Sequence, residues 1–213
     1  MIKKEAGTLD LKGKGMLVVL SGPSGSGKDT ILGKLKESTF TFDKTISATT
    51  RAIRDGEKDG VDYFFIDKAT FEKKIANGEF LEYTVYSGNY YGTLKSEVER
   101  LVAKGGCILL KIEVEGAGNI RKAIPDALSV FIVPPSIEEL ERRLRGRNTE
   151  TEESIQKRLK EAIKELARAN EYDYIVINDD ADLCTEQVIK ILESEKLRYC
   201  RMADFVNDML ENQ

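Results

Sequence analysis

Short apolar runs alternate with amphipathic stretches along most of the chain. The apolar run at residues 16–20 ends in a glycine-rich turn, which is typical of a buried parallel strand, and a helix is expected at 30–36. From residue 93 onward the pattern predicts three more strands, at 107–112, 128–133 and 174–177. The helices expected around them lie near 93–103, from about 117, at 137–144, in a long stretch ending near 169, and after 177. This alternation predicts an α/β fold with a parallel sheet flanked by helices.

Two segments interrupt this rhythm. Residues 40–50 resemble a second strand and lead into a polar stretch, after which 63–91 alternates aromatic and polar residues around one short helix at 68–77. This predicts a small β-rich lobe. The second interruption is a short arginine-rich turn at 145–150. Inserted lobes and lids of this kind commonly bind substrates.

These patterns give an expected domain organisation. A polar N-terminal extension at 1–15 precedes one domain at 16–213. Within that domain we expect a core at about 16–46 and 94–213, an inserted lobe at about 47–93, and a lid at about 145–157.

Composition narrows the classes of function. The 213 residues are 41% hydrophobic and 33% charged, and a net charge of −4 argues against general affinity for nucleic acid or anionic membranes. The chain has no histidine, which excludes histidine-based triads and histidine metal sites. No apolar stretch approaches the ~18 residues of a membrane span, and residues 1–15 lack the apolar run of a signal peptide. We therefore expect a cytoplasmic protein, a compartment that three unpatterned cysteines also fit.

The glycine-rich loop after the first strand carries the clearest chemistry. This P-loop consists of Gly22, Pro23, Ser24, Gly25, Ser26, Gly27, Lys28, Asp29 and Thr30. Its glycines allow backbone N–H groups to turn toward phosphate oxygens at a helix N-terminus, and Lys28 supplies a positive charge at the β- and γ-phosphates. Asp29 stands where the strict pattern requires Ser or Thr. The base-reading N-K-x-D motif of GTPases is absent, which favours a kinase.

A second cluster can bind another phosphate. Arg51, Arg54 and Tyr63 lie among small hydroxyl residues, and two guanidinium groups and a phenol can converge on one phosphate. Taken alone, this segment is equally consistent with a solvated loop.

Several spaced motifs make the prediction specific. They are S-x-T-T-R-x-x-R-x-G-E-x-x-G-x-D-Y at 47–63, F-L-E-Y at 80–83, S-G-N-Y-Y-G at 87–92, P-P-S at 134–136, R-L-R-G-R at 143–147 and N-D-D at 178–180. Together with the P-loop they resemble the guanylate kinase family, in the family's order, over residues 16 to about 200. The resemblance implies a P-loop core with a GMP-binding lobe and a lid. It also implies an enzyme of purine nucleotide metabolism that transfers phosphate from ATP to GMP, and to dGMP, with Mg²⁺ as cofactor.

The resemblance also implies roles for individual residues. Guanine would be read by Ser47, Glu82 and Thr93, with Glu113 as a further contact to guanine or to the water molecules of Mg²⁺. The GMP phosphate would be held by Arg51, Arg54, Tyr63 and Tyr91. Catalysis would rest on Lys28, Arg51, Arg143, Arg147 and Arg158, with Asn178 near the adenine. The chemistry agrees, since one carboxylate can accept hydrogen bonds from both the N1–H and the 2-amino group of guanine, whereas adenine has no N1 proton.

The chain departs from the family pattern near the P-loop. Lys111 occupies a position where the family usually has an acid, and Glu115 one where it usually has Gln. Related nucleoside monophosphate kinases usually place Gly at the position of Asp29, so Asp29 either lends a carboxylate to Mg²⁺ or caps the helix N-terminus. We expect these changes to alter Mg²⁺ affinity or turnover. The tyrosines at 83, 86 and 90 are expected in the core of the lobe.

Two alternative functions remain open. The same scaffold could phosphorylate another acceptor, such as a sugar phosphate, but Ser47, Glu82 and Thr93 favour guanine. A non-catalytic guanylate-kinase-like module could bind phosphopeptides, but the intact Gly27 and Lys28 favour catalysis. The oligomeric state is open as well, because the amphipathic C-terminal helix from Cys184 onward could pack on its own core or on a partner subunit.

Overall fold

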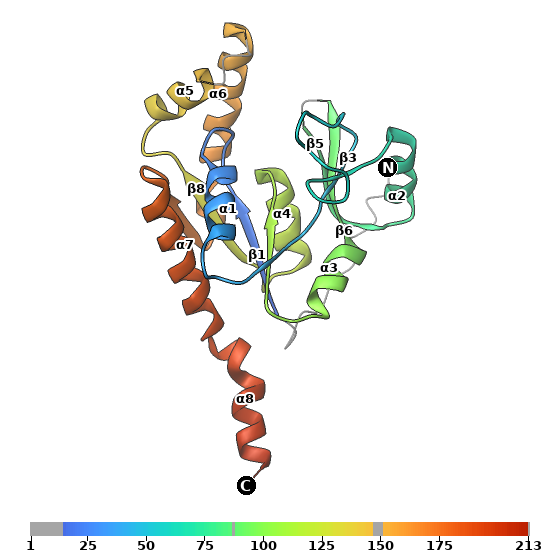
Figure 1. Cartoon of the computed structure of the whole chain (residues 1–213), viewed down its shortest axis with the longest axis vertical. Coiled ribbons are helices and arrows are strands. Elements are labelled where there is room, and N and C mark those ends of the chain that lie inside the picture. Colours follow the sequence, from blue (N-terminus) through green and yellow to red (C-terminus); the bar gives the residue numbers. More distant parts are fainter. Residues whose placement is uncertain (1–14, 87, 147–150, 213) are drawn as a thin grey trace. The chain divides into compact units, whose positions relative to one another are not determined.

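The structure, a computed structural model, describes residues 15–86, 88–146 and 151–212 (Figure 1). Its strands are β1 (Met16–Ser21), β2 (Asp43–Lys44), β3 (Ala48–Thr49), β4 (Phe64–Phe65), β5 (Phe80–Tyr86), β6 (Asn89–Leu94), β7 (Cys107–Lys111), β8 (Leu128–Val133) and β9 (Tyr174–Ile177). Its α-helices are α1 (Lys28–Glu37), α2 (Lys68–Ala76), α3 (Lys95–Val102), α4 (Val114–Ala123), α5 (Ile137–Arg145), α6 (Glu152–Leu166), α7 (Ala181–Lys196) and α8 (Tyr199–Glu211). A five-stranded sheet has the order β2-β7-β1-β8-β9, and a four-stranded sheet has the order β4-β3-β6-β5.

The chain folds as two compact units, which are described separately. The first unit comprises the described part of Met1–Leu17, together with Phe42–Leu110 and Glu115–Ala127. The second unit comprises Val18–Thr41, Lys111–Val114 and Leu128–Gln213.

In the second unit, parallel strands carry the P-loop at their carboxyl end. β1 pairs with β8, with Leu20 opposite Val130, and β8 pairs with β9, with Val130 opposite Tyr174. All side chains of β1 are buried, as expected of an apolar parallel strand covered on both faces. Helices α1 and α7 pack against each other. Helices α5 and α6 share a small core formed by Leu140, Leu144, Ile155 and Ala162.

In the first unit, a β-rich lobe is built around stacked aromatic rings. β5 and β6 pair in antiparallel fashion, and β3 pairs with both β6 and β4. The ring of Phe71 on α2 stacks on Phe80 at 4.2 Å and on Tyr90 at 5.0 Å between centroids. Asp67 caps α2 by accepting a hydrogen bond from the backbone N–H of Thr70. The stacked rings provide the apolar contact that a sheet this small needs in order to be stable.

Most of the expected elements are confirmed. The strands at 128–133 and 174–177 agree to the residue, and α2 ends one residue earlier than expected. Ser136 caps α5 by accepting a hydrogen bond from the backbone N–H of Glu139. α1 and α4 each begin two or three residues before the expected starts, and α6 ends at 166, followed by a short 3₁₀ helix at Ala169–Glu171. The helix expected near 93–103 is also confirmed as α3, which begins at Lys95 because Thr93 pairs with Glu82 in the lobe sheet.

Two local expectations are wrong. The single strand predicted at 40–50 is two two-residue strands, β2 and β3, which belong to different sheets, because the chain crosses from one sheet to the other between them. Tyr83 is 43% exposed rather than in the lobe core, whereas Tyr90 lies in that core.

No helix within the described ranges has both the length and the apolar character needed to cross a membrane.

Candidate functional site

The P-loop in the second unit has a conformation that requires glycine. Gly22 has φ 150°, and a Cβ there would lie 2.2 Å from the carbonyl oxygen of Ile132. Gly27 has φ 91°, and a Cβ there would lie 2.1 Å from Nδ2 of Asn178. Both the left-handed backbone and the close contacts exclude a side chain at these positions. The loop is therefore fixed by its neighbours as well as by its own sequence.

The side chain of Lys28 lies against the P-loop. Its Nζ donates hydrogen bonds to the carbonyl oxygens of Gly22 at 2.6 Å and Pro23 at 3.0 Å, and the residue is 9% exposed. The ammonium group is thereby held at the loop whose backbone N–H groups open α1.

Arginine and asparagine side chains from three other segments of the second unit reach the P-loop. Asn178, which follows β9, donates from Nδ2 to the carbonyl oxygen of Ser26 at 2.8 Å. Arg143 on α5 donates from Nη2 to the carbonyl oxygen of Asn178 at 2.9 Å, and Arg158 on α6 donates from Nη2 to Oγ of Ser24 at 2.7 Å. The structure thus brings three of the predicted residues together around the loop. Arg147 lies outside the described residues.

Two carboxylates lie near the P-loop, and only one of them, Glu113, was predicted from the sequence. Glu165 on α6 accepts a hydrogen bond from the backbone N–H of Ser24 at 3.3 Å. Burial and, to a smaller extent, the charge of Glu113 raise the pKa of Glu165 to about 7, against the opposing effect of Lys28. Oε2 of Glu113 is buried and has no hydrogen-bond partner. Sequence reasoning missed Glu165 because it is one of several glutamates in a charged helix.

Asp29 does not cap the helix. The N-cap residue of α1 is Gly27, and Asp29 lies in the first turn. Its Oδ1 forms an ion pair with Nζ of Lys111, the last residue of β7. The interpretation of Asp29 as a helix cap is therefore wrong, because its carboxylate turns toward a lysine 82 positions away in the sequence.

In the first unit, Glu82 and Thr93 form a buried polar pair across β5 and β6. Thr93 Oγ1 donates to Oε1 of Glu82 at 2.7 Å. The pKa of Glu82 is raised to about 7, because burial and the charge of Glu115 raise it by more than the hydrogen bonds from Thr93 lower it. A Cβ at Gly116 would lie 2.7 Å from Oε2 of Glu82, so the glycine leaves room for the carboxyl group.

A second group in the first unit brings together Arg51 and two tyrosines. The guanidinium carbon of Arg51 lies 5.5 Å from the centre of the Tyr63 ring, and the Tyr63 and Tyr91 rings meet edge to face at 6.0 Å. Arg51 also forms a 2.7 Å ion pair with Glu57. The hydrogen bond between them raises the pKa of Arg51 and lowers that of Glu57. Glu57 was not predicted as a site residue, although it is the glutamate of the motif at 47–63.

The remaining candidates lie beside these groups in the chain. Arg54 is exposed, and its backbone N–H donates to Oε2 of Glu57 at 2.9 Å. The carbonyl oxygen of Ser47 accepts from the backbone N–H of Phe64 at 2.9 Å, just before β3. Thr30, at the end of the P-loop, is exposed.

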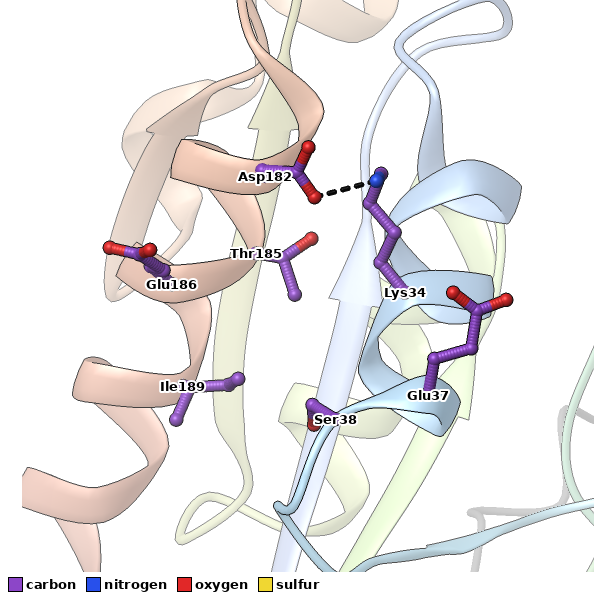
Figure 2. Close-up of a pocket in the computed structure, with 7 residues that line it drawn as sticks. All are labelled: Lys34, Glu37, Ser38, Asp182, Thr185, Glu186 and Ile189. Carbon is purple, nitrogen blue, oxygen red and sulfur yellow. Dashed lines mark hydrogen bonds and ion pairs between the residues drawn. The ribbon is translucent and has the colours of Figure 1, made fainter.

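A separate pocket of about 260 Å³ lies between α1 and α7 in the second unit (Figure 2). Lys34 and Asp182 face each other across it and form a 2.6 Å ion pair. The other lining residues are Glu37, Ser38, Thr185, Glu186 and Ile189. The pocket is lined by the later turns of α1 and contains no P-loop residue.

Comparisons with known proteins identify the family. The guanylate kinase family model matches residues 14–195. Guanylate kinases from two strains of Streptococcus thermophilus are each 43% identical over 201 residues, which cover 94% of this chain and 96% of theirs. The crystal structure of guanylate kinase from Anaplasma phagocytophilum superposes with a TM-score of 0.74 at 37% identity, covering 89% of this chain and 90% of the other. The chain therefore belongs to the guanylate kinase family.

Proposed function

We propose that this chain transfers the γ-phosphate of ATP to GMP, and also to dGMP, giving ADP and the corresponding diphosphate. The observation that carries the proposal is the buried Glu82 carboxyl group beside Thr93, which matches the two hydrogen-bond donors of guanine. An intact P-loop with Lys28 in the second unit supplies the donor side.

The Glu82 carboxylate reads the base. With one oxygen held by Thr93, it accepts hydrogen bonds from the guanine N1–H and 2-amino group, and Ser47 and Glu113 are the further candidates for contact with guanine. Adenine lacks the N1 proton, so the buried carboxylate would lose a partner at a cost of ~1–3 kcal/mol or more. This cost supports GMP, rather than AMP or a sugar phosphate, as the acceptor.

The group around Arg51 holds the acceptor phosphate. Arg51 can present its guanidinium fork to phosphate oxygens while Glu57 fixes its orientation. The hydroxyl groups of Tyr63 and Tyr91 and the exposed Arg54 complete the set of donors that we assign to this phosphate.

The P-loop binds the triphosphate of ATP through backbone N–H groups of its residues other than Pro23 and through the ammonium group of Lys28. The charge of the transferring phosphoryl group is neutralised by Arg143, Arg147 and Arg158. Two of these arginines, Arg143 and Arg158, already form hydrogen bonds in this region. Asn178 holds the P-loop through its hydrogen bond to the carbonyl oxygen of Ser26, and we assign it a place near the adenine.

The reaction needs no general base. The second pKa of a phosphate monoester is about 6, so the GMP phosphate is largely a ready nucleophile at pH 7. The demand on the protein is to neutralise charge and align two anions that repel each other. The arginines and Lys28 meet the first demand.

The residues present fit a hydrated Mg²⁺ ion. The buried Oε2 of Glu113, which has no hydrogen-bond partner, is suited to accept from a metal-bound water molecule, with Glu165 nearby. Within the described residues, no group of three or more Cys, Asp or Glu could hold a metal ion. When bound, Mg²⁺ supplies neutralisation of the β- and γ-phosphate charge.

The proposal places the chain in the cytoplasm, with ATP and GMP as its partners and no role for nucleic acid or membranes. A net charge of −4 supports this assignment of partners.

One variant pair separates catalysis from simple binding. Lys28→Met should lower kcat by on the order of 10²–10⁴ because it removes a cation at the transferring phosphate. GMP affinity, measured by calorimetry, should stay within about twofold because all the residues assigned to GMP except Glu113 belong to the first unit, whereas Lys28 belongs to the second. Lys34→Met, on the same helix but paired with Asp182, is the matched control and should keep full activity. If the unmodified chain bound phosphopeptides and released no ADP with GMP, the non-catalytic alternative would hold instead.

A further inference from the structure

An ion pair between Lys111 and Asp29 joins the end of β7 to the first turn of α1 in the second unit. The Lys111 side chain is 20% exposed, and that of Asp29 is 77% exposed. The residue after Lys111 is tied to the same region, because the backbone N–H of Ile112 donates to the carbonyl oxygen of Leu20 at 3.3 Å. Leu20 is two residues before Gly22, so Lys111 is anchored at the base of the P-loop.

The Lys111–Asp29 pair places one positive and one negative charge close to Lys28, the lysine that we assign to phosphate binding. Asp29 directly follows Lys28, whose ammonium group rests on the loop carbonyls. By resemblance, the family usually has an acid at position 111, and related kinases usually have Gly at position 29. This chain therefore carries a cation at the strand end, where an acid is usual, and holds that cation with a carboxylate on the loop side.

We infer that Lys111 is a further nucleotide-binding residue, a second lysine that attracts the phosphates of ATP from the end of β7. The inference rests on the proposed binding of ATP at the P-loop. The Asp29 carboxylate is 77% exposed and is therefore screened by solvent more than the Lys111 ammonium group, which is 20% exposed. The positive charge that remains attracts the triphosphate and repels a divalent cation. Compared with a chain that has an acid at this position, this chain binds metal-free ATP more tightly, and its ATP complex binds the metal less tightly.

The alternative is that the pair is an ordinary surface ion pair. Such pairs contribute little when both partners are solvated, and Asp29 is largely exposed. Lys111 differs in being mostly covered, so its charge is screened less than that of a surface lysine.

The test is a titration of the folded chain with ATP in EDTA, followed by Mn²⁺ binding to the ATP complex measured from the free Mn²⁺ signal in electron paramagnetic resonance. Lys111→Met should weaken metal-free ATP binding by about 5- to 10-fold, because it removes a positive charge that attracts the phosphates. The same change should tighten Mn²⁺ binding several-fold, because it removes a charge that repels the metal ion. Lys111→Glu should shift both affinities further in the same directions.

Lys34→Met is the matched control. Lys34 also pairs with an aspartate that is 77% exposed, but its partner is on α7 (Figure 2). Both affinities should stay within about twofold in this variant, since Lys34 lies about 9 Å further along α1 than Lys28. Thermal unfolding followed by circular dichroism confirms that each variant is folded.

The outcomes distinguish this inference from the proposed function. If the unmodified chain fails to bind ATP, the proposed function fails. If it binds ATP and phosphorylates GMP while Lys111→Met changes neither affinity by more than twofold, the inference is wrong. Equal effects of Lys111→Met and Lys34→Met would also overturn it, because they would reflect net charge alone.

Discussion

Under the proposed function, the buried carboxyl group of Glu82 makes base recognition depend on pH. Its pKa is raised from 4.5 to about 7, mainly by burial. Between these values the folded chain binds a proton that the unfolded chain has released, so the free energy of unfolding decreases as pH rises through this interval. The full shift corresponds to a loss of about 3 kcal/mol. A bound guanine would stabilise the ionised form and offset part of that loss.

We expect GMP affinity to fall as pH decreases below about 7, because protonation of Glu82 removes an acceptor for the guanine donors. Calorimetric titration with GMP between pH 5.5 and 8 measures this dependence. In Glu82→Gln, affinity should be weaker at pH 8, and the remaining pH dependence should be that of the GMP phosphate alone. An identical pH profile in both proteins would show that Glu82 does not titrate on binding.

The sequence predicted the residue types of the site but not their pairings. Ser47, Glu82 and Thr93 could be named because they belong to spaced motifs, whereas Glu165 belongs to no motif. The pairing of Lys111 with Asp29 spans 82 positions and depends on how β7 and α1 meet. Such contacts come from the tertiary fold, so local patterns carry no signal for them.

Among the elements, the turn from β1 through the P-loop to α1 depends most on particular glycines. Gly27→Ala should destabilise the fold by about 1–3 kcal/mol, because alanine disfavours φ 91° and its Cβ would displace Asn178. Gly33→Ala in the middle of α1 is the matched control. Its Cβ would meet nothing within 4 Å, so it should stabilise the fold by ~0.5–1 kcal/mol.

Urea unfolding of the two alanine variants measures both changes. ATP affinity should fall in Gly27→Ala and remain unchanged in Gly33→Ala. If Gly27→Ala were as stable as the unmodified chain, the P-loop would not be held against Asn178 in the way the structure describes.

Some strands could be predicted from the sequence better than others. The strands β8 and β9 followed directly from short apolar runs bounded by polar turns. The strands β2 and β3 did not, because each has only two residues and is defined by its partner strand rather than by its own pattern. The lobe was predicted as β-rich, but the exposed position of Tyr83 depends on which face of β5 meets the lobe core.

At the scale of the whole molecule, the C-terminal helix α8 contributes least to the core among the α-helices of the described residues. It extends beyond the end of α7 (Figure 1), and none of its residues is buried. Its exposed apolar side chains are Tyr199, Phe205, Val206, Met209 and Leu210. The sequence left open whether the helix from Cys184 onward packs on its own core. Its part in α7 does, because Cys184, Val188 and Leu192 are buried, whereas α8 has no buried residue.

Removal of residues 199–213 should leave folding and activity nearly intact. Since α8 contributes no buried side chain, we expect Tm to change by only a few degrees and kcat for GMP to stay within about twofold. Circular dichroism melting and ADP release measure the two quantities. A large loss of Tm would show that α8 is buried in the protein in solution.

The central claim is that the chain is an ATP-dependent kinase that selects guanine. The most direct test is the ratio of kcat/KM for GMP to that for AMP, measured by ADP release with ATP and Mg²⁺. The account predicts a ratio of at least on the order of 10², since a site built for guanine donors leaves a buried carboxylate unpaired with adenine. A ratio near one, or no ADP release that depends on GMP, would contradict it.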